Sequence, residues 1–153
     1  HPQHAEVVLD RLTALDAAEQ KLDDALLRNE AEATRNPTSA PLRILVAKAC
    51  ILKKDTPRAI SELQRAIEIQ PENPEAAFLL AQLYLQSNED GKALANLENV
   101  VAKNPRDIAA WLMLAQIHSQ RKNYTAARDA YEKTVSINPN RRRFAATPKV
   151  TWR

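Results

Sequence analysis

Few side chains in this sequence are of the types that carry out catalysis or bind metal ions. The 153 residues include three histidines, His1, His4 and His118, and a single cysteine, Cys50. His1 and His4 could share a metal ion, because imidazole is a common metal ligand, but two ligands near one end of a chain are a weak signal. A single cysteine cannot form an internal disulfide bond.

The remaining candidates for chemistry are better explained by structural roles. We interpret Cys50 and His118 as packing residues, because they fall at core-facing positions of the repeat described below. Neighbouring acids such as Asp23 and Asp24 are more typical of a solvated helix face than of a pair for proton transfer. With one glycine, Gly91, the chain has no glycine-rich loop that could hold a phosphate. The sequence therefore predicts a non-catalytic protein with no metal ion and no cofactor.

Three prolines spaced by 34 residues, Pro71, Pro105 and Pro139, indicate an internal repeat. In repeats of this length each unit buries its apolar face against its neighbours. The corresponding windows are residues 40–73, 74–107 and 108–141. Small residues recur in register, which lets paired helices approach closely. The eighth residue is Ala47, Ala81 or Ala115, and the twentieth is Ala59, Ala93 or Ala127.

Each window predicts a pair of helices. Apolar residues recur at spacings of three and four over residues 41–53, 75–87 and 108–121, and turn residues follow each stretch. The second helices are expected to end at Gln70, Asn104 and Asn138, because the residue before a proline disfavours helix. No alternating pattern of the kind that strands show is present. The predicted fold class is therefore all-α.

This pattern resembles the tetratricopeptide repeat (TPR) family. The third window matches the signature of that family at Trp111, Leu114, Ala115, Ala127, Tyr131 and Pro139. The second matches it at Leu80, Ala81, Tyr84, Ala93 and Pro105. The chain departs from the signature at Arg43, Ala77, Cys50 and His118. The resemblance implies a right-handed solenoid of antiparallel helix pairs with an N-terminal capping helix, and a protein- or peptide-binding surface.

Residues 1–39 precede the regular repeats and allow two interpretations. Large apolar residues recur every seven places, at Val8, Leu15 and Leu22, so the region could form one long amphipathic helix. Alternatively, Leu12, Ala25 and Pro37 fall in the register of a degenerate repeat. Because no turn residue interrupts the middle of the region, we favour the single helix.

The two ends of the chain carry opposite charges within a net charge of +3. Residues 1–40 hold eight acids and four bases, whereas residues 141–153 hold five bases and no acid. Such ends could attract each other within one molecule or between molecules. The basic tail, residues 142–153, contains three large apolar residues: Phe144, Val150 and Trp152. We expect them either to fold back on the last repeat, to dock in a neighbouring groove, or to belong to a disordered linker.

The TPR resemblance also implies a binding surface. In that family the first helix of each repeat lines a concave groove through fixed positions. Carried over, these are the partner-binding residues Ile44, Lys48, Ile51, Glu75, Phe78, Gln82, Leu85, Leu112, Gln116 and Ser119. This surface suits an extended peptide or an amphipathic helix, unless its apolar members only pack within the repeats. One TPR subfamily binds acidic C-termini with several cations, but Lys48 is the only cation at the matching positions.

The predicted function is a protein–protein interaction scaffold whose groove holds a peptide or a partner helix. Regular, alanine-rich repeats of this style are similar to those of bacterial assembly and export scaffolds, so a bacterial cytoplasmic or periplasmic location is expected. No apolar run of about 18 residues suggests a membrane span, and no leader is visible. Nucleic-acid binding is disfavoured, because the repeats have no basic stripe. The alternative is a self-associating structural module, a homo-oligomer assembled through the N-terminal helix or the C-terminal tail.

Overall fold

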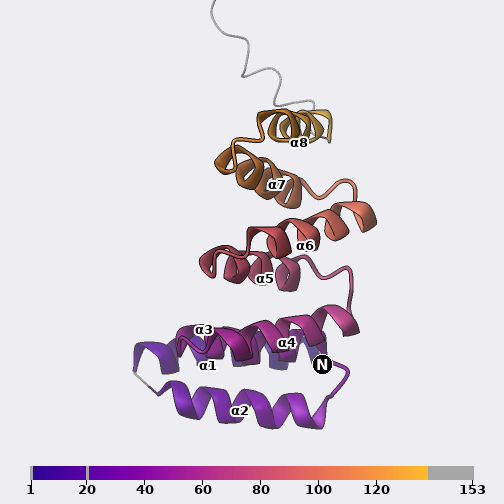
Figure 1. Ribbon diagram of the computed structural model, residues 1–153. Helices are drawn as coiled ribbons and strands as arrows, with labels where there is room; N and C mark the ends of the chain where they lie inside the picture. Colours follow the sequence, from indigo (N-terminus) through magenta and orange to yellow (C-terminus); the bar gives the residue numbers. More distant parts are fainter. Residues whose placement is uncertain (1, 20, 138–153) are drawn as a thin grey trace, which may run out of the picture. The chain divides into compact units, whose positions relative to one another are not determined.

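A computed structural model describes residues 2–19 and 21–137, and all regular structure in this part of the chain is helical. In order, the helices are α1 (Pro2–Ala18), α2 (Leu22–Arg35), α3 (Ala40–Leu52), α4 (Thr56–Ile69), α5 (Pro74–Gln86), α6 (Asp90–Lys103), α7 (Ile108–Gln120) and α8 (Tyr124–Ile137) (Figure 1). The described part of the chain divides into two compact units between residues 96 and 97; we call the first unit 1 and the second unit 2. The boundary falls within α6.

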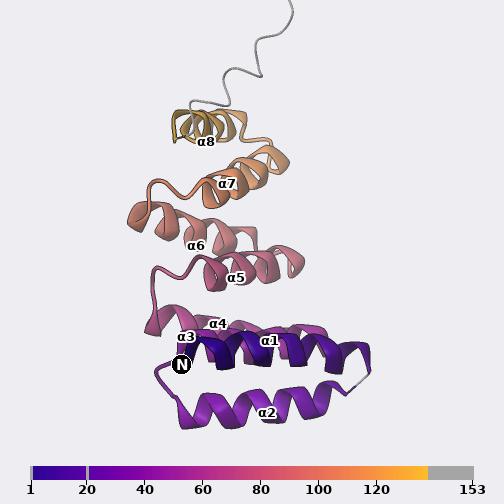
Figure 2. The same cartoon turned by 180° about the vertical axis from the view of Figure 1, so that it is seen from behind.

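Unit 1 is built around α3. This helix packs against α4 in the same repeat and against both α1 and α2, and α4 in turn packs against α5. Figures 1 and 2 show α1 and α3 lying side by side above α2. Alanines at the close approaches, such as Ala47 and Ala59, are fully buried, and Leu63 fills the space between helices. Small residues therefore set the helix spacing, and large ones fill the remaining volume.

The expectation of a single long helix over residues 1–39 is wrong. α1 ends at Ala18 and α2 begins at Leu22, and the two run antiparallel (Figure 1). This is the helix pair that the degenerate-repeat interpretation describes. The pair is fixed by contacts that no local pattern reveals: Arg28 forms an ion pair of 2.8 Å with Asp16. Buried Asn29 also donates a hydrogen bond of 2.9 Å to the Thr13 hydroxyl.

The helices begin and end with the same local chemistry in successive repeats. N-cap side chains accept hydrogen bonds from first-turn amides at Ser39, Asp55, Asn73 and Asp107. Two residues beyond the end of the first helix of each pair, the backbone is left-handed: Lys54, Asn88 and Lys122 have φ of 61°, 58° and 60°. The next amide then reaches back to a carbonyl five residues earlier, as in the bond of 2.8 Å from Asn123 to His118. This is a Schellman cap, which closes the helix and starts the turn.

Replacing Lys122 with glycine is expected to raise the free energy of unfolding by about 0.5–1 kcal/mol, because glycine adopts positive φ without the steric cost of a Cβ atom. Urea denaturation followed by circular dichroism measures the change. Lys133→Gly is the matched control in the interior of α8, where glycine should lower stability by about 1 kcal/mol. If both variants change the free energy of unfolding in the same direction, the left-handed conformation of Lys122 does not account for the effect.

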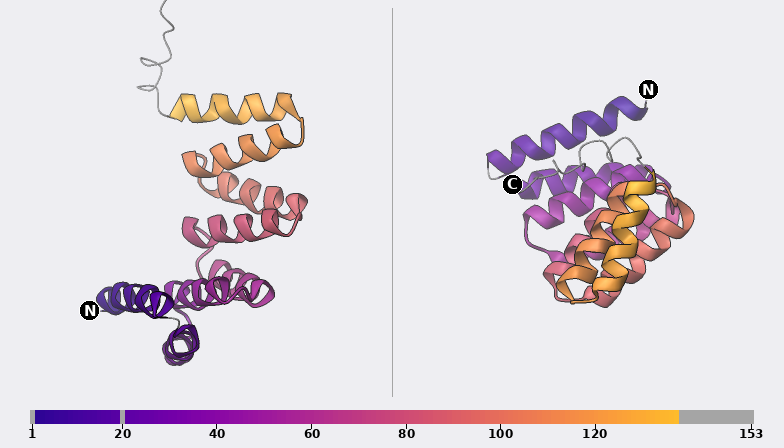
Figure 3. Two further views of the ribbon diagram at one scale, coloured as in Figure 1. Left: turned by 90° about the vertical axis from the view of Figure 1, so that its left-hand side faces the viewer. Right: turned by 90° about the horizontal axis from the view of Figure 1, so that it is seen from above.

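In unit 2, α7 and α8 form an antiparallel pair (Figures 1 and 3). Buried Ala115 and Ala127 lie at the places where small residues are expected. None of the helices in residues 2–19 and 21–137 combines the length and the apolar character that crossing a bilayer requires. The hypothesis about Phe144, Val150 and Trp152 concerns residues outside the described part of the chain, as does that about the side chains of His1 and His4.

Candidate functional site

The best-defined candidate site lies on unit 1, where α1, α3 and α5 meet at one lysine. The ammonium of Lys48, on α3, lies 2.9 Å from Asp10 Oδ1 on α1 and 2.8 Å from Glu75 Oε1 on α5. Three helices far apart in the sequence therefore share one polar cluster. Partly exposed pairs of this kind add little to stability, but they orient the side chains around them.

Two pockets adjoin at this cluster, because Asp10 and Lys48 line both. One, of about 390 Å³, is lined by Glu6, Val7, Asp10, Arg11, Pro41, Ile44, Leu45, Lys48 and Glu75. The other, of about 270 Å³, is lined by Asp10, Thr13, Ala14, Lys48, Ile51, Leu52 and Leu79. We call the two together the α1–α3–α5 groove. One side of the groove is rich in charge and the other is mainly apolar, which is typical of sites that bind segments of other proteins.

Lys48 stays charged in this setting. Partial burial by itself lowers the pKa of Lys48, but the hydrogen bonds and negative charges of Glu75 and Asp10 outweigh it and raise the pKa above its ordinary value of 10.5. The groove thus keeps a cation at its centre at any physiological pH.

The stabilising effect of Lys48 is expected to disappear at high pH. Because its pKa is raised on folding, the contribution is complete at pH values below the ordinary value of 10.5 and is lost as the pH rises through the higher folded value. The free energy of unfolding of the wild type should therefore fall relative to that of Lys48→Met between about pH 8 and about pH 11. Urea titrations at both pH values measure the difference in the free energy of unfolding between the wild type and Lys48→Met. If this difference is the same at both pH values, the ion pairs do not contribute to stability.

The structure brings some of the expected binding residues together in unit 1. Ile44, Lys48, Ile51 and Glu75 line the α1–α3–α5 groove. The other expected residues of α5 are not among the lining residues: Phe78 and Gln82 are exposed and Leu85 is half-buried. Those of α7 belong to unit 2, where Leu112, Gln116 and Ser119 are exposed. Whether these residues bind a partner remains a prediction.

Sequence reasoning missed the contribution of α1 and of Leu79. Val7, Asp10 and Ala14 line the groove, and each lies 34 residues before a residue that also lines it, namely Pro41, Ile44 or Lys48. Extending the repeat period by one window towards the N-terminus would have identified them. A single long helix over residues 1–39 would not form a helix pair packed on α3, so that interpretation did not predict a contribution from α1.

Cys50 and His118 were interpreted from the sequence as packing residues, and the structure shows how far each is buried. Cys50 is fully buried, and burial raises the pKa of its thiol. His118 is half-buried beside Trp111 and Leu114, where these residues line a mostly apolar cavity of about 280 Å³. The burial of Cys50 and the half-buried position of His118 agree with the packing interpretation of both residues.

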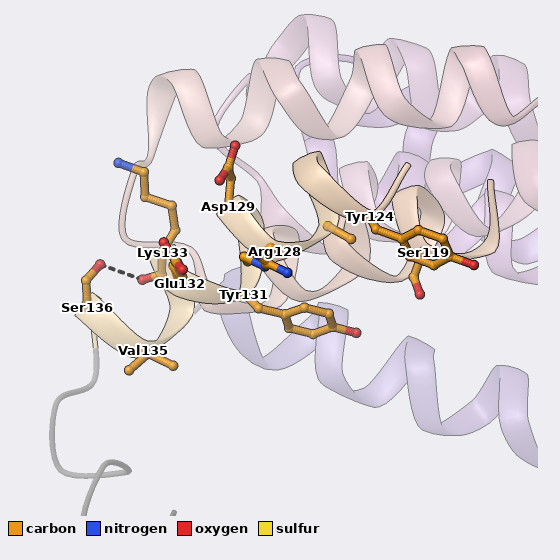
Figure 4. A pocket seen from close by; sticks show the side chains of 10 residues that line it. Ser119, Tyr124, Arg128, Asp129, Tyr131, Glu132, Lys133, Val135 and Ser136 are labelled. Carbon is orange, nitrogen blue, oxygen red and sulfur yellow. Dashed lines mark hydrogen bonds between the residues drawn. The ribbon is translucent and has the colours of Figure 1, made fainter. Parts of the chain in front are cut away.

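A larger hollow lies on α8 in unit 2. It has a volume of about 990 Å³ and includes the exposed rings of Tyr124 and Tyr131 (Figure 4). Every lining residue except Ser119 comes from α8 itself. One face of one helix cannot surround a ligand, so we regard the α1–α3–α5 groove as the stronger candidate.

Comparisons with protein families and with solved structures both find TPR proteins. Residues 35–144 match the family described as the cytochrome c-type biogenesis protein H TPR domain. No curated protein is similar enough to count as a relative.

Several solved structures are similar. A crystal structure of MamA is 20% identical with a TM-score of 0.73, over 90% of this chain and 81% of that one. MamA from Desulfovibrio magneticus RS-1 is 19% identical with a TM-score of 0.66, over 88% and 76%. The thermophilic TPR protein TTC0263 of Thermus thermophilus is 19% identical with a TM-score of 0.67, over 90% and 78%. At such identities the likeness shows a shared fold.

Proposed function

The chain belongs to the cytochrome c-type biogenesis protein H TPR domain family, and on that premise we propose that it is a non-catalytic scaffold that holds a peptide or partner helix. The all-α TPR fold expected from the sequence is confirmed. TPR folds are interaction surfaces built from repeated helix pairs, so a protein partner is the natural ligand.

The observation that supports this proposal most directly is the α1–α3–α5 groove. Its two adjoining pockets differ in character, since one contains Glu6, Asp10 and Arg11 and the other contains Ile51 and Leu79. A segment lying across both could place an apolar side chain in one and a polar group in the other. Such pairing of an anchor with a polar contact is how grooves select a peptide.

The description of the family also suggests a setting. It names cytochrome c-type biogenesis, which is an assembly process. We extend the proposal to a bacterial assembly or export complex, in which the groove would hold a segment of a protein on its way to its final form.

Selection of peptides on the full chain tests the proposal. A phage-displayed library of random peptides is selected against the immobilised protein, and the best peptide is titrated into isotopically labelled protein while amide NMR shifts are followed. The shifts are expected to change mainly in α1, α3 and α5, around Asp10, Lys48 and Leu79. Shifts confined to unit 2, or selection that yields no saturable binder, would contradict a ligand in this groove.

A further inference from the structure

The chemistry of the α1–α3–α5 groove favours a cationic segment with large apolar side chains. The pocket at its charged side contains three carboxylates, from Glu6, Asp10 and Glu75, against two cations, Arg11 and Lys48. Lys48 contacts one oxygen of Asp10 and one of Glu75. Each of these carboxylates has a second oxygen and a side chain about half exposed, at 51% and 53%, so it can accept another hydrogen bond from a guanidinium or ammonium group.

The apolar side of the groove defines the second requirement. Ile51, Leu52 and Leu79 line it, and the side chain of Leu52 is 46% exposed. Covering this surface with a phenylalanine, valine or tryptophan side chain removes apolar area from water, which favours binding. A suitable ligand therefore combines several cations with large apolar residues and contains no acid that would face Asp10 and Glu75.

Residues 141–153 of the same sequence have this composition. They contain five bases and no acid, and their large apolar residues are Phe144, Val150 and Trp152. The complementary charge lies at the other end of the chain, where residues 1–40 have twice as many acids as bases. Opposite charges on the two ends steer copies towards a head-to-tail encounter.

We propose that the basic C-terminal segment of a second copy, residues 141–153, docks in the α1–α3–α5 groove. This inference rests on the proposed function, because it names one occupant of the same groove. Each copy presents one groove and one basic segment, so the contact is heterologous and can extend from copy to copy. The arrangement needs no particular placement of unit 1 relative to unit 2 within one chain.

The mass of the full chain, measured by sedimentation velocity over a concentration series, tests the inference. At about 50 mM NaCl the mass is expected to rise with concentration, and at about 500 mM NaCl it should approach that of one chain, because salt screens the attraction. A chain that stays monomeric at all concentrations in low salt overturns the inference, whether its basic segment is free or docks within the same molecule.

Two variants locate the contact. Glu75→Lys in the groove, and Arg141→Gln combined with Arg142→Gln and Arg143→Gln in the basic segment, are each expected to weaken self-association at least about tenfold. A mixture of the two should form a 1:1 dimer, because the intact groove of one variant meets the intact segment of the other. Glu68→Lys, the same charge change at an exposed site on α4, is the control and should behave as the wild type.

Further outcomes separate this inference from the proposed function. If Glu75→Lys is not stably folded by circular dichroism, Asp10→Asn replaces it in the same assay. If neither groove variant alters self-association while both weaken binding of the selected peptide, the inference fails and the proposed function stands. If self-association and peptide binding are both unaffected, both fail. A basic-segment variant that associates as the wild type also overturns the inference.

Discussion

Replacing Leu63 with alanine is expected to lower the free energy of unfolding by about 3–4 kcal/mol. Leu63 is fully buried in α4, so its truncation leaves a cavity in a closely packed core. Urea denaturation followed by circular dichroism measures the loss. In unit 1 this loss would be a large part of the total stability of a small domain.

The matched control for Leu63→Ala is Leu52→Ala. Leu52 ends α3 and is 46% exposed, so its truncation leaves no closed cavity. Its cost is expected to stay below about 1 kcal/mol. Equal losses for the two variants would mean that the repeat core does not depend on close packing around Leu63.

The helix pairs of the three repeats could be predicted from the sequence because their ends are determined locally. The first helices were expected at 41–53, 75–87 and 108–121, and they span Ala40–Leu52, Pro74–Gln86 and Ile108–Gln120. Capping side chains such as Asp55, prolines in the first turn and the residue before each periodic proline all act within a few residues of the helix end. Such signals are visible in a single sequence.

The break between α1 and α2 could not be predicted in the same way. No glycine or proline lies between Ala18 and Leu22. The antiparallel pairing depends instead on contacts between distant residues, including Asn29 with Thr13 and Arg28 with Asp16. A helix-favouring composition is overridden here by packing against α3, as tertiary context often overrides propensity.

The candidate site was predicted only where it follows the repeat register. Ile44, Lys48 and Ile51 were identified from their positions in the first window, and they line the groove. Leu79 was missed because helix packing turns it, rather than Phe78, towards Ile51. A rotation of one helix by part of a turn relative to its neighbour is a three-dimensional property that position numbers do not contain.

The largest effect on binding is expected from Leu79→Glu. This substitution places a carboxylate in the apolar pocket beside Asp10, where a ligand would have to cover it without a partner. The cost of desolvating that charge, added to its repulsion by Asp10, is expected to weaken binding of the selected peptide at least about 100-fold. Fluorescence polarisation with the labelled peptide measures the dissociation constant for each variant.

Ile69→Glu is the matched control, because Ile69 ends α4, is 37% exposed and lies outside the residues that line the groove. It introduces the same charge on the same unit and is expected to change binding less than about threefold. Both variants should keep the helical circular dichroism of the wild type, since neither site is fully buried. If Leu79→Glu binds the peptide as tightly as Ile69→Glu, the ligand does not enter the pocket between α1, α3 and α5. Amide NMR shifts around Ile51 would then stay unchanged on adding the peptide, because an apolar anchor in this pocket cannot avoid contact with that side chain.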